Sequence, residues 1–414
     1  MLCTAMEAEV VIVGAGLAGL ACARRLVQEG VLVALLEGAE RVGGRVATDE
    51  LDGFLLDRGF QVLLSSYPEA RRVLDLDALE LRPFEPGSLV HHGDRTWRFV
   101  DPWRAPLRGL ATLRAPFLTL GDAARMARLR RAAIAGSGEV QGTALEMLRQ
   151  RGFSEALIEA FLRPFFGGVT LDPDLNVPAW YLFSLFGWFA TGDAVLPARG
   201  MQAIPEQLAS ALPTSSLQLG TRVTSVTPRS VELESGKRIE ARAVVLATDA
   251  ATTAQLLGHR RAPTWSGTTT LYYAAERSPV GEPILVLNGD GPKDGPVNHL
   301  CVLSDAQPTY APAGAALVSV SVLGVPTRDD AELDRAARAQ LARWYDADVR
   351  AWRLLRTDRI ANALPRAFSR TQGSVEPDGV IVCGDHVATP SIQGALESGR
   401  RAAEAAVERL PVRA

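Results

Sequence analysis

Residues 10–37 decide the fold, and they run VVIVGAGLAGLACARRLVQEGVLVALLE. Residues 9–13 are mostly apolar and β-branched and end at a glycine, a pattern typical of a buried parallel strand. Over residues 17–29 the apolar side chains follow helical spacing up to the glycine at position 30. Residues 31–36 predict a second buried strand. Strand, helix and strand together form one βαβ unit.

The first strand and the helix are joined by the motif G-x-G-x-x-G, which comprises Gly14, Gly16 and Gly19. Gly14 permits a tight turn, Gly16 lets the backbone approach a pyrophosphate, and Gly19 lets the helix pack close to the strand. Leu17 and Ala18 open the helix, where free N–H groups and the positive end of the helix dipole favour an anion. The motif predicts a dinucleotide site but does not separate FAD from NAD.

Glu37 ends the second strand, where a carboxylate can accept hydrogen bonds from ribose hydroxyls and would repel a 2′-phosphate. NADP is therefore disfavoured. The next loop completes the pattern E-x-x-x-R-x-G-G-R, made by Glu37, Gly38, Arg41, Gly43, Gly44 and Arg45. Arginine forks suit phosphate oxygens, and paired glycines let the backbone come close, so the loop favours a second phosphate contact over a solvated basic turn.

Together with three later segments, this region resembles the flavin-containing amine oxidase superfamily. That superfamily includes monoamine and polyamine oxidases, protoporphyrinogen oxidase and the phytoene desaturase type. The later segments are Leu56-Asp57-Arg58-Gly59-Phe60-Gln61, Gly200-Met201-Gln202-Ala203-Ile204-Pro205 and the stretch 383–403 that starts Cys383-Gly384-Asp385. Arg199 stands where the family has a glycine. The motifs span the whole chain in the family's order and are specific to the superfamily, not to one member.

The resemblance implies a non-covalent FAD. Glu37 would bind the adenosine ribose, and Arg41 and Arg45 would lie near the pyrophosphate. Asp385 would bind the ribityl or pyrophosphate part, and a helix that starts near Ile392 would aim its positive end at the flavin pyrimidine. The other cofactor contacts implied by the resemblance are Gly59, Phe60, Gln61, Val223 through its backbone, Ala247, Gly384, Ser391, Gln393 and Ala395.

Three departures from the amine oxidases bear on the chemistry. Many of those enzymes carry a lysine near the flavin, whereas the matching stretch here, residues 267–273, has none. Ser391 stands where the family tends to place an aromatic wall of an amine cage. Residues 362–368 resemble the proline-containing stretch of the protoporphyrinogen oxidase and desaturase branch. These departures weigh against amine oxidation and fast use of O₂, but not against FAD.

No catalytic residue is predicted, because flavin chemistry needs little acid–base help from the protein. The histidines form no recognisable triad, and a structural role is the interpretation even for His386, which follows Asp385. No metal site is predicted, because the four cysteines form no C-x-x-C pair. These residues are His91, His92, His259, His299 and His386, and Cys3, Cys22, Cys301 and Cys383. The aromatic run 180–189 is interpreted as core, with pocket lining as the alternative.

The predicted fold class is α/β, with a discontinuous Rossmann-type FAD-binding domain and a substrate domain of mixed sheet plus helices. The predicted FAD-binding domain comprises residues 1–85, 191–260 and 365–414, and the substrate domain 86–190 and 261–364. Further strands are expected at 217–226, 230–233, 244–248, 268–274, 316–323 and 379–383. Further helices are expected over 105–140, 143–166, 178–190, 202–211, 329–345 and 392–410. Residues 84–106 and 165–177 are interpreted as loops rich in turn residues.

The composition excludes some partners. A net charge of −3 over 414 residues gives no sign of the basic patch that nucleic acid requires. The N-terminus has no signal-peptide pattern, and no run reaches the roughly 18 apolar residues of a membrane span, so a cytoplasmic protein is expected. Residues 106–135 pair apolar residues with arginines. A solvated helical face is the favoured interpretation there, and contact with a membrane surface is the alternative.

The expected function is FAD-dependent hydride transfer from a C–N or C–C bond of a small or lipophilic organic substrate. One alternative is a desaturase or isomerase that acts on isoprenoids, carotenoids or tetrapyrroles. A second is a protein that binds FAD or NAD without catalysis. The sequence predicts neither the substrate, nor the electron acceptor, nor the oligomeric state.

Overall fold

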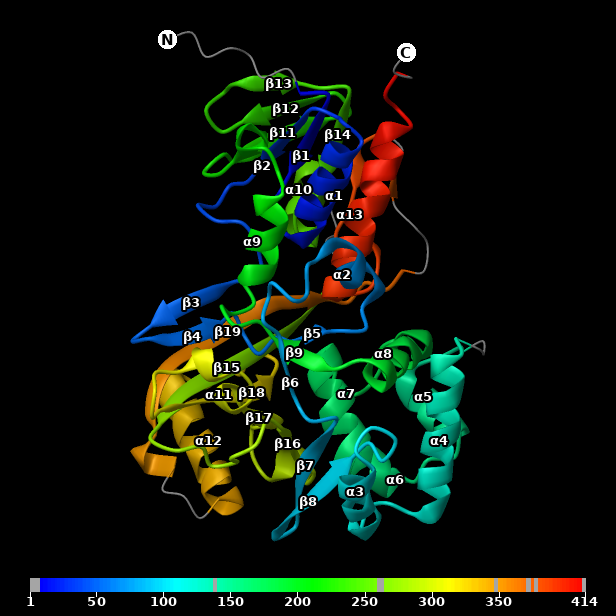
Figure 1. Cartoon of the computed structure of the whole chain (residues 1–414), viewed down its shortest axis with the longest axis vertical. Helices are drawn as coiled ribbons and strands as arrows, with labels where there is room; N and C mark the ends of the chain where they lie inside the picture. Colours follow the sequence, from blue (N-terminus) through cyan, green and yellow to red (C-terminus); the bar gives the residue numbers. More distant parts are fainter. Residues whose placement is uncertain are drawn as a thin grey trace.

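Two large β-sheets organise the chain, one in the upper and one in the lower part of the molecule (Figure 1). The structure, a computed structural model, describes residues 8–136, 140–258, 264–345, 349–369, 374–375 and 379–411. Cys3 and His259 lie outside the described residues.

The upper sheet has six strands in the order β10-β2-β1-β14-β21-β20. These strands are β1 (Val10–Val13), β2 (Val33–Leu36), β10 (Leu217–Gln218), β14 (Ala243–Leu246), β20 (Ser374–Val375) and β21 (Ile381–Val382). All neighbours are parallel except β20 and β21. The three strands β2, β1 and β14 are buried along their whole length, as their unbroken apolar sequences predict for a sheet that is covered on both faces.

Three helices cover one face of the upper sheet: α1 (Leu17–Gln28), α9 (Ala203–Ser210) and α13 (Ile392–Val407). Helices α1 and α13 lie side by side (Figure 1). They approach closely because a Cβ at Gly399 would collide with the carbonyl oxygen of Ala18. The other face packs against the antiparallel strands β11 (Val223–Thr227), β12 (Ser230–Leu233) and β13 (Arg238–Glu240), with α10 (Ala250–Leu256) beside them.

The lower sheet has seven strands in the order β19-β15-β18-β17-β16-β7-β8. They are β7 (Gly87–His92), β8 (Arg95–Val100), β15 (Trp265–Ala275), β16 (Leu285–Asn288), β17 (His299–Val302), β18 (Ala316–Leu323) and β19 (Arg353–Pro365). Along β15, Leu271 and Tyr273 pack beneath α12 (Asp330–Trp344), whereas Tyr272 joins the core of the upper part. The face of the sheet opposite α12 is therefore turned towards the upper sheet.

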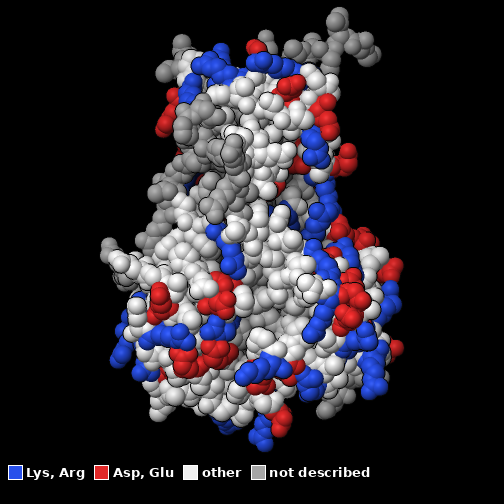
Figure 2. Space-filling view, turned by 180° about the vertical axis from the view of Figure 1, so that it is seen from behind, with Lys and Arg blue, Asp and Glu red and all other residues white. Residues whose placement is uncertain are grey.

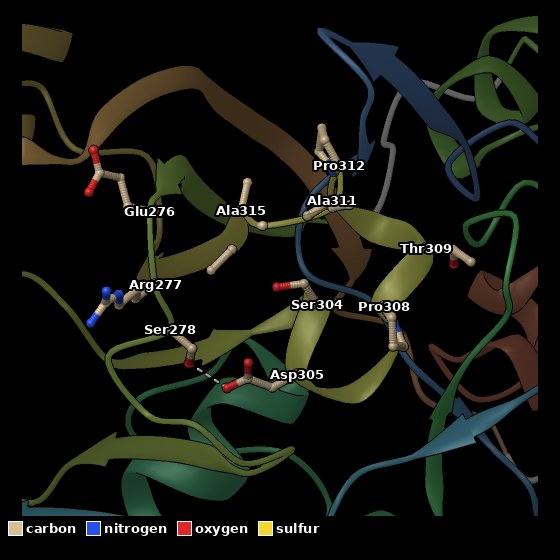
Figure 3. A pocket seen from close by; sticks show the side chains of 13 residues that line it. Glu276, Arg277, Ser278, Ser304, Asp305, Pro308, Thr309, Ala311, Pro312 and Ala315 are labelled. Atoms are coloured by element: carbon tan, nitrogen blue, oxygen red, sulfur yellow. Dashed lines mark hydrogen bonds between the residues drawn. The ribbon is translucent and has the colours of Figure 1, made fainter.

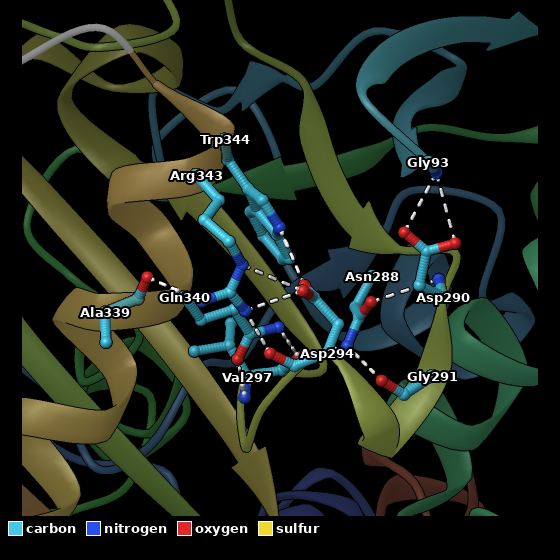
Figure 4. A network of polar contacts seen from close by, with 10 residues as sticks. All are labelled: Gly93, Asn288, Asp290, Gly291, Asp294, Val297, Ala339, Gln340, Arg343 and Trp344. Carbon is cyan, nitrogen blue, oxygen red and sulfur yellow. Dashed lines mark hydrogen bonds and ion pairs between the residues drawn. The ribbon is translucent and has the colours of Figure 1, made fainter.

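A polar network holds α12 against the loop between β16 and β17 (Figure 4). Arg343 and Trp344 both bind the side chain of Asp294, Arg343 at 2.6 Å and the indole N–H at 3.0 Å. The side chain of Gln340 accepts from Val297 N at 2.8 Å and donates to Val297 O at 3.1 Å. These bonds satisfy backbone groups that the loop would otherwise leave unpaired.

A layer of helices flanks the lower sheet. It comprises α3 (Pro106–Gly109), η1 (Leu110–Arg114), α4 (Leu120–Ile134), α5 (Ala144–Gln150), α6 (Glu155–Leu157), the π-helical η2 (Ile158–Leu162), α7 (Arg163–Thr170) and α8 (Ala179–Thr191). Tyr181 and Phe183 are buried, and Phe186 packs 5.0 Å from Phe166 between ring centroids, so the aromatic run is core, as interpreted. Within the described residues no helix has both the length and the apolarity to cross a bilayer.

The buried carboxylate of Asp57 joins the segments between the two sheets. It ends β4 (Phe54–Asp57), which pairs with β3 (Thr48–Leu51). Its Oδ1 accepts from Thr48 Oγ1 at 2.5 Å and from Met201 N at 3.0 Å, and its Oδ2 accepts from Tyr310 Oη at 2.9 Å. Burial raises the pKa of Asp57 from 3.8 to about 6, although these three donors lower it.

Short elements complete this junction. They are β5 (Leu63–Leu64), β6 (Arg82–Pro83), β9 (Ala194–Leu196), α2 (Pro68–Val73), α11 (Leu303–Ala306) and η5 (Pro308–Tyr310). Strand β9 pairs with both β5 and β6, so the chain that returns from the helical layer is tied to the chain that leaves the first βαβ unit.

Five local predictions differ from the structure. The predicted helix 105–140 is divided into α3, η1 and α4, with a non-helical segment over 115–119, and it ends at Ile134. Residues 84–106 were predicted to be a loop but contain the hairpin β7–β8. Its strands could not be predicted because glycine, proline and charged residues interrupt the apolar pattern. Helix α7 continues to Thr170 within the predicted loop 165–177. The predicted strand 217–226 is two strands of different sheets, β10 and β11. The long strand β19 was not predicted, because arginine recurs at every third position from Arg353 to Arg359, so the period of two that is typical of a strand is missing.

The strands of the upper sheet fall within the ranges predicted for the FAD-binding domain, and those of the lower sheet within or one residue beyond the ranges predicted for the substrate domain. The boundaries 1–85, 191–260 and 365–414 against 86–190 and 261–364 stay a prediction.

Asp57 makes stability depend on pH. Because its pKa is raised on folding, the native state binds the extra proton between pH 3.8 and about 6, and the unfolding free energy falls as pH rises through this window. We expect Asp57→Asn to remove a fall on the order of 3 kcal/mol from urea titrations across the window. The exposed Asp94→Asn should leave it intact. Parallel curves for Asp57→Asn and wild type would contradict this assignment.

Candidate functional site

The glycine motif forms a turn that no other residue could make without strain. Gly14 has φ +103°, and a Cβ on it would lie 2.8 Å from the carbonyl oxygen of Ala247. A Cβ on Gly19 would overlap the carbonyl oxygen of Gly14 and lie 3.1 Å from the Ala247 side chain. The predicted contacts Gly14, Gly19 and Ala247 therefore lie together where β1 and β14 end.

The N-terminus of α1 is open and unsatisfied. A Cβ on Gly16 would meet no heavy atom within 4 Å. Among the described residues, none accepts a hydrogen bond from the amides of Ala18 and Gly19, although both residues are buried. The preceding Gly16 pairs with Gly43 in an isolated parallel bridge. The first turn carries no acidic residue and no side-chain cap. Buried free amides beside open space fit the diphosphate of a dinucleotide such as FAD.

Glu37 lies directly beside this turn. Its Oε2 accepts from Ala15 N at 2.7 Å and its Oε1 from Ala39 N at 2.9 Å. The backbone oxygen of Glu37 accepts from Thr221 N at 2.7 Å, two residues before Val223 starts β11. A Cβ on Gly38 would lie 3.8 Å from Arg222. The structure thus brings Glu37, the predicted ribose contact, next to the segment of Val223, the predicted adenine contact.

The loop of residues 41–45 folds over the glycine turn. Gly43 N donates to Ala15 O at 2.9 Å, and a Cβ on Gly44 would lie 3.7 Å from the Cα of Gly16. Arg41 points elsewhere: its guanidinium binds Thr48 O at 3.1 Å and Asp49 at 2.7 Å. Arg41 therefore binds the β3–β4 hairpin and does not point into the glycine turn.

Arg45 binds the C-terminal motif. Its two terminal nitrogens donate to the carboxylate of Asp385 at 2.8 and 2.5 Å, which is a fork-to-fork ion pair. The Asp385 side chain is 5% exposed, whereas that of Arg45 is 37% exposed. Arg45 also donates to Ala363 O at 2.9 Å, and its guanidinium lies 5.3 Å from the centroid of the Trp265 ring. Two segments 340 residues apart therefore meet in one site.

The segment after Asp385 leads into the N-terminus of α13, which is also open. Gly384 has φ +147°, and its N–H donates to Ser398 Oγ at 3.0 Å. Ser391 caps α13 by accepting from Gly394 N at 3.0 Å, and Ala395 N bonds to Ser391 O. The amides of Ile392 and Gln393 have no acceptor among the described residues. The Gln393 side chain instead accepts from Glu69 N at 2.9 Å, which holds α2 against α13.

The predicted segment beside the flavin ring links both parts of the molecule. A Cβ on Gly59 would lie 2.9 Å from Ile360 of β19, so this turn rests on the lower sheet. The ring of Phe60 lies 5.4 Å from that of His299 between centroids. Gln61 donates to Arg45 O at 3.0 Å and to Arg58 O at 2.8 Å. Gly59, Phe60 and Gln61 thus connect the Arg45 loop with the sheet below.

Buried polar atoms without partners include two groups to which the sequence assigned no place in the site, Thr270 and His299. His299 Nε2 and Thr270 Oγ1 have no hydrogen-bond partner among the described residues, and Thr270 Oγ1 would lie 3.8 Å from a Cβ on Gly59. Burial lowers the pKa of His299 to about 4, so its imidazole is neutral at pH 7. Both ring nitrogens of His386 are also unpartnered. His299 stands alone in an apolar strand, and nothing in the sequence around it indicates that its side chain faces the Gly59 segment.

Two cavities lined by described residues differ in their distance from the predicted cofactor contacts. The larger, of about 530 Å³, lies at the far end of β15, where Ser278 Oγ donates to Asp305 at 2.5 Å (Figure 3), and none of the predicted cofactor residues lines it. The smaller, of about 280 Å³, is lined by Ser266, Arg366 and Phe368 and by the loop between α7 and α8. Ser266 follows Trp265, and Phe368 packs 5.3 Å from Tyr181, whose hydroxyl donates to Pro390 O. The smaller cavity therefore adjoins the Arg45 and Ser391 segments.

The face of the molecule drawn in Figure 2 carries charges of both signs. On the face drawn in Figure 2, acidic and basic side chains are interspersed over the lower part of the molecule, and neither sign forms a continuous field. Among the described residues no cluster of three or more histidines, cysteines or acids could hold a metal ion.

The ion pair between Arg45 and Asp385 should stabilise the protein even without a cofactor. Arg45→Gln would leave a buried carboxylate without its two charged donors, and we expect the unfolding free energy of the FAD-free protein to fall by about 2 kcal/mol. Arg353→Gln is the matched control, because its pair with Asp52 is more than half exposed and is worth at most about 1 kcal/mol. Equal losses in urea denaturation would argue against a special role for the buried pair.

Comparison with known proteins agrees with this geometry. The family model described as flavin containing amine oxidoreductase matches residues 17–407. Putrescine oxidase from Kocuria rosea is 46% identical over 77 residues, which are 19% of this chain and 16% of that protein. Coproporphyrinogen III oxidase from Propionibacterium freudenreichii is 32% identical over 115 residues, 23% of this chain and 22% of that protein. The matches thus span less than a quarter of the length of either relative.

The fold is shared over a much longer stretch. The crystal structure of an oxidoreductase from Methanosarcina mazei superposes with a TM-score of 0.74 and 18% identity, covering 94% of this chain and 98% of that one. The predicted fold class is thereby confirmed. The family match confirms the predicted resemblance, the FAD cofactor and the class of FAD-dependent oxidoreductase: the chain belongs to the family of flavin-containing amine oxidoreductases.

Proposed function

We propose that this protein transfers a hydride from a C–N or C–C bond of an organic substrate to an FAD that is held without a covalent link. The observation that carries the proposal is the convergence of two helix N-termini with free amides, those of α1 and α13, on either side of the Arg45–Asp385 ion pair. Bound flavin would accept the hydride, and the protein would supply position and electrostatics.

Different residues would bind different parts of the cofactor. The amides of Ala18 and Gly19, with Gly14, Gly16, Gly43 and Gly44 as close-approach positions, would hold the diphosphate. Glu37 would bind the ribose, and Val223 would meet the adenine through its backbone. Asp385 and Arg45 would hold the ribityl chain. The start of α13 at Ser391 to Ala395 would stabilise negative charge on the pyrimidine side of the ring.

The substrate would lie beside the segment of Gly59 and Phe60, against the face of the lower sheet that is turned towards the upper sheet. The cavity of about 280 Å³ at Ser266 and Phe368 is the proposed entrance. Its lining mixes apolar rings with Asp172, Asn176 and Arg366, which suits a substrate that is small or partly apolar. The neutral imidazole of His299 would meet such a substrate as a hydrogen-bonding group without a charge.

A second candidate function is desaturation or isomerisation of an isoprenoid or tetrapyrrole. The observation that favours it is the position of the two lysines. Lys237 lies in the turn before β13 and Lys293 in the short helix η4 (Gly291–Lys293), so neither belongs to the face of β15 beneath Gly59. An enzyme without a lysine there would pass electrons to O₂ slowly. Binding of FAD without catalysis is the third alternative.

The cysteines bear on the compartment in which the protein works. Cys22, Cys301 and Cys383 are free and buried, and burial raises the pKa of each of them, so all three stay protonated. Such thiols suit a reducing compartment, and the cytoplasm stays our prediction.

Glu37→Arg tests the cofactor assignment. The variant removes the acceptor for the ribose hydroxyls, and the loss of charge-assisted hydrogen bonds should cut the flavin that remains after desalting by about tenfold. The ratio of flavin to protein absorbance measures this loss. Glu40→Arg makes the same charge change three residues later on an exposed position and should keep its flavin. Full retention by Glu37→Arg, with an unchanged circular dichroism spectrum, would refute the assignment.

A further inference from the structure

One stretch of the surface exposes large apolar side chains in unusual number. Of the ten large apolar residues exposed in the described part of the chain, six lie between residues 103 and 134, so they form a local feature. The exposed fractions are 49% for Trp103, 88% for Leu107, 65% for Leu110, 55% for Leu113, 81% for Leu120 and 45% for Ile134. We call this set of six residues the leucine face. Trp103 lies in the turn before α3, and the other five residues lie on α3, η1 and α4, at the base and side of the lower part in Figure 1.

The leucines point outward because the backbone of α3 and η1 requires it. Leu110 and Leu113 are three residues apart in the 3₁₀ helix η1, where side chains at that spacing lie one above the other, and Leu107 lies one turn earlier in α3. The opposite side of the same turns is buried: Gly109 packs on Pro102, and Thr112 is 6% exposed. This helix therefore turns its apolar row to the solvent and its small and polar residues to the protein, the reverse of the usual pattern.

Two hydrogen bonds fix this orientation. Thr112 Oγ1 accepts from Val100 N at 2.9 Å and donates to Val100 O at 3.0 Å, so the hydroxyl is bound to the edge strand β8. The leucine row cannot rotate inward unless both bonds break.

Basic residues outnumber acids around the leucine face. Residues 101–135 contain seven arginines and two acids, Asp101 and Asp122. Four of these arginines form ion pairs, which are Arg104 with Asp193, Arg108 with Glu85, Arg125 with Asp122 and Arg130 with Asp101. Asp122 is fully buried, where Thr119 and Ser154 donate to its carboxylate. Arg114, Arg128 and Arg131 are exposed, and none of the described carboxylates forms an ion pair with them. These three arginines therefore leave a net positive charge on the helices that carry the leucines.

We propose that the leucine face inserts into the interface of an anionic lipid bilayer. Leu107 and Leu120 are so exposed that they protrude, which suits insertion between lipids, whereas docking of a peptide would require a groove. Trp103 and the leucines would enter the boundary of the acyl chains, and the exposed arginines would bind phosphate groups. A symmetric contact with a second copy would set the same arginines against each other, so lipid is the better occupant.

Sedimentation with vesicles tests the proposal. The full chain with its flavin is mixed with vesicles of phosphatidylcholine plus phosphatidylserine, or of phosphatidylcholine alone. We expect binding to the anionic vesicles and at least about tenfold weaker binding to the neutral ones, with a loss at high salt. The double variant Leu107→Glu/Leu110→Glu should bind anionic vesicles at least about tenfold more weakly than wild type.

The matched control is Leu32→Glu/Val325→Glu, which adds the same charge at exposed apolar positions outside the leucine face and should bind like wild type. Arg128→Gln/Arg131→Gln should weaken binding to anionic vesicles only. Circular dichroism and flavin content check that each variant is folded. Absence of binding by wild type, or equal binding by the leucine variant, would overturn the proposal. A wild-type dimer that Leu107→Glu/Leu110→Glu turns into a monomer would also overturn it, in favour of a self-interface.

Discussion

The contact between Arg45 and Asp385 is the interaction on which the arrangement of the site depends. A buried carboxylate that is 5% exposed needs a partner, and the only way for Arg45 to reach it is for the loop after β2 to lie across the ends of β1, β14 and β21. That position brings Gly43 and Gly44 over the glycine turn and keeps the start of α1 clear. The N-terminal and C-terminal halves of the cofactor site are thus one structure, although 340 residues separate them.

Asp57 plays the corresponding part between the two sheets. Its carboxylate is bound by a hairpin, by the turn before α9 and by Tyr310, and the hydroxyl of Tyr272 from the lower sheet donates to its backbone oxygen at 2.9 Å. The turn of Gly59 follows directly and rests on β19. The segment that would meet the flavin ring is therefore held between the sheet that binds the cofactor and the sheet that would face the substrate. Burial of this carboxylate favours its protonated form, so the junction gains stability as the pH falls towards 3.8.

The cofactor half of the site could be predicted from the sequence because each of its features depends on residues that are close together along the chain. Gly14 reports a turn that only glycine makes, and Gly16 and Gly19 report places without room for, or without need of, a side chain. Glu37 follows a strand whose four residues are all buried. The substrate half could not be predicted, because its chemistry depends on neighbours across strands. Thr270 and His299 lie on different strands, and both pair with Ser321 of β18. Likewise the spacing of Leu107, Leu110 and Leu113 suggests a helix, but only the burial of Thr112 shows that the leucines face outward.

The central claim is that the two helix N-termini and the Arg45–Asp385 pair hold a non-covalent FAD that takes part in redox chemistry. The most direct test is the absorbance spectrum of the purified protein, before and after acid precipitation, followed by anaerobic photoreduction and readmission of air. The account predicts flavin bands, release of all colour into the supernatant, reversible bleaching, and slow reoxidation over minutes because no lysine lies on the face of β15 beneath Gly59. A colourless protein that takes up no added FAD would contradict it.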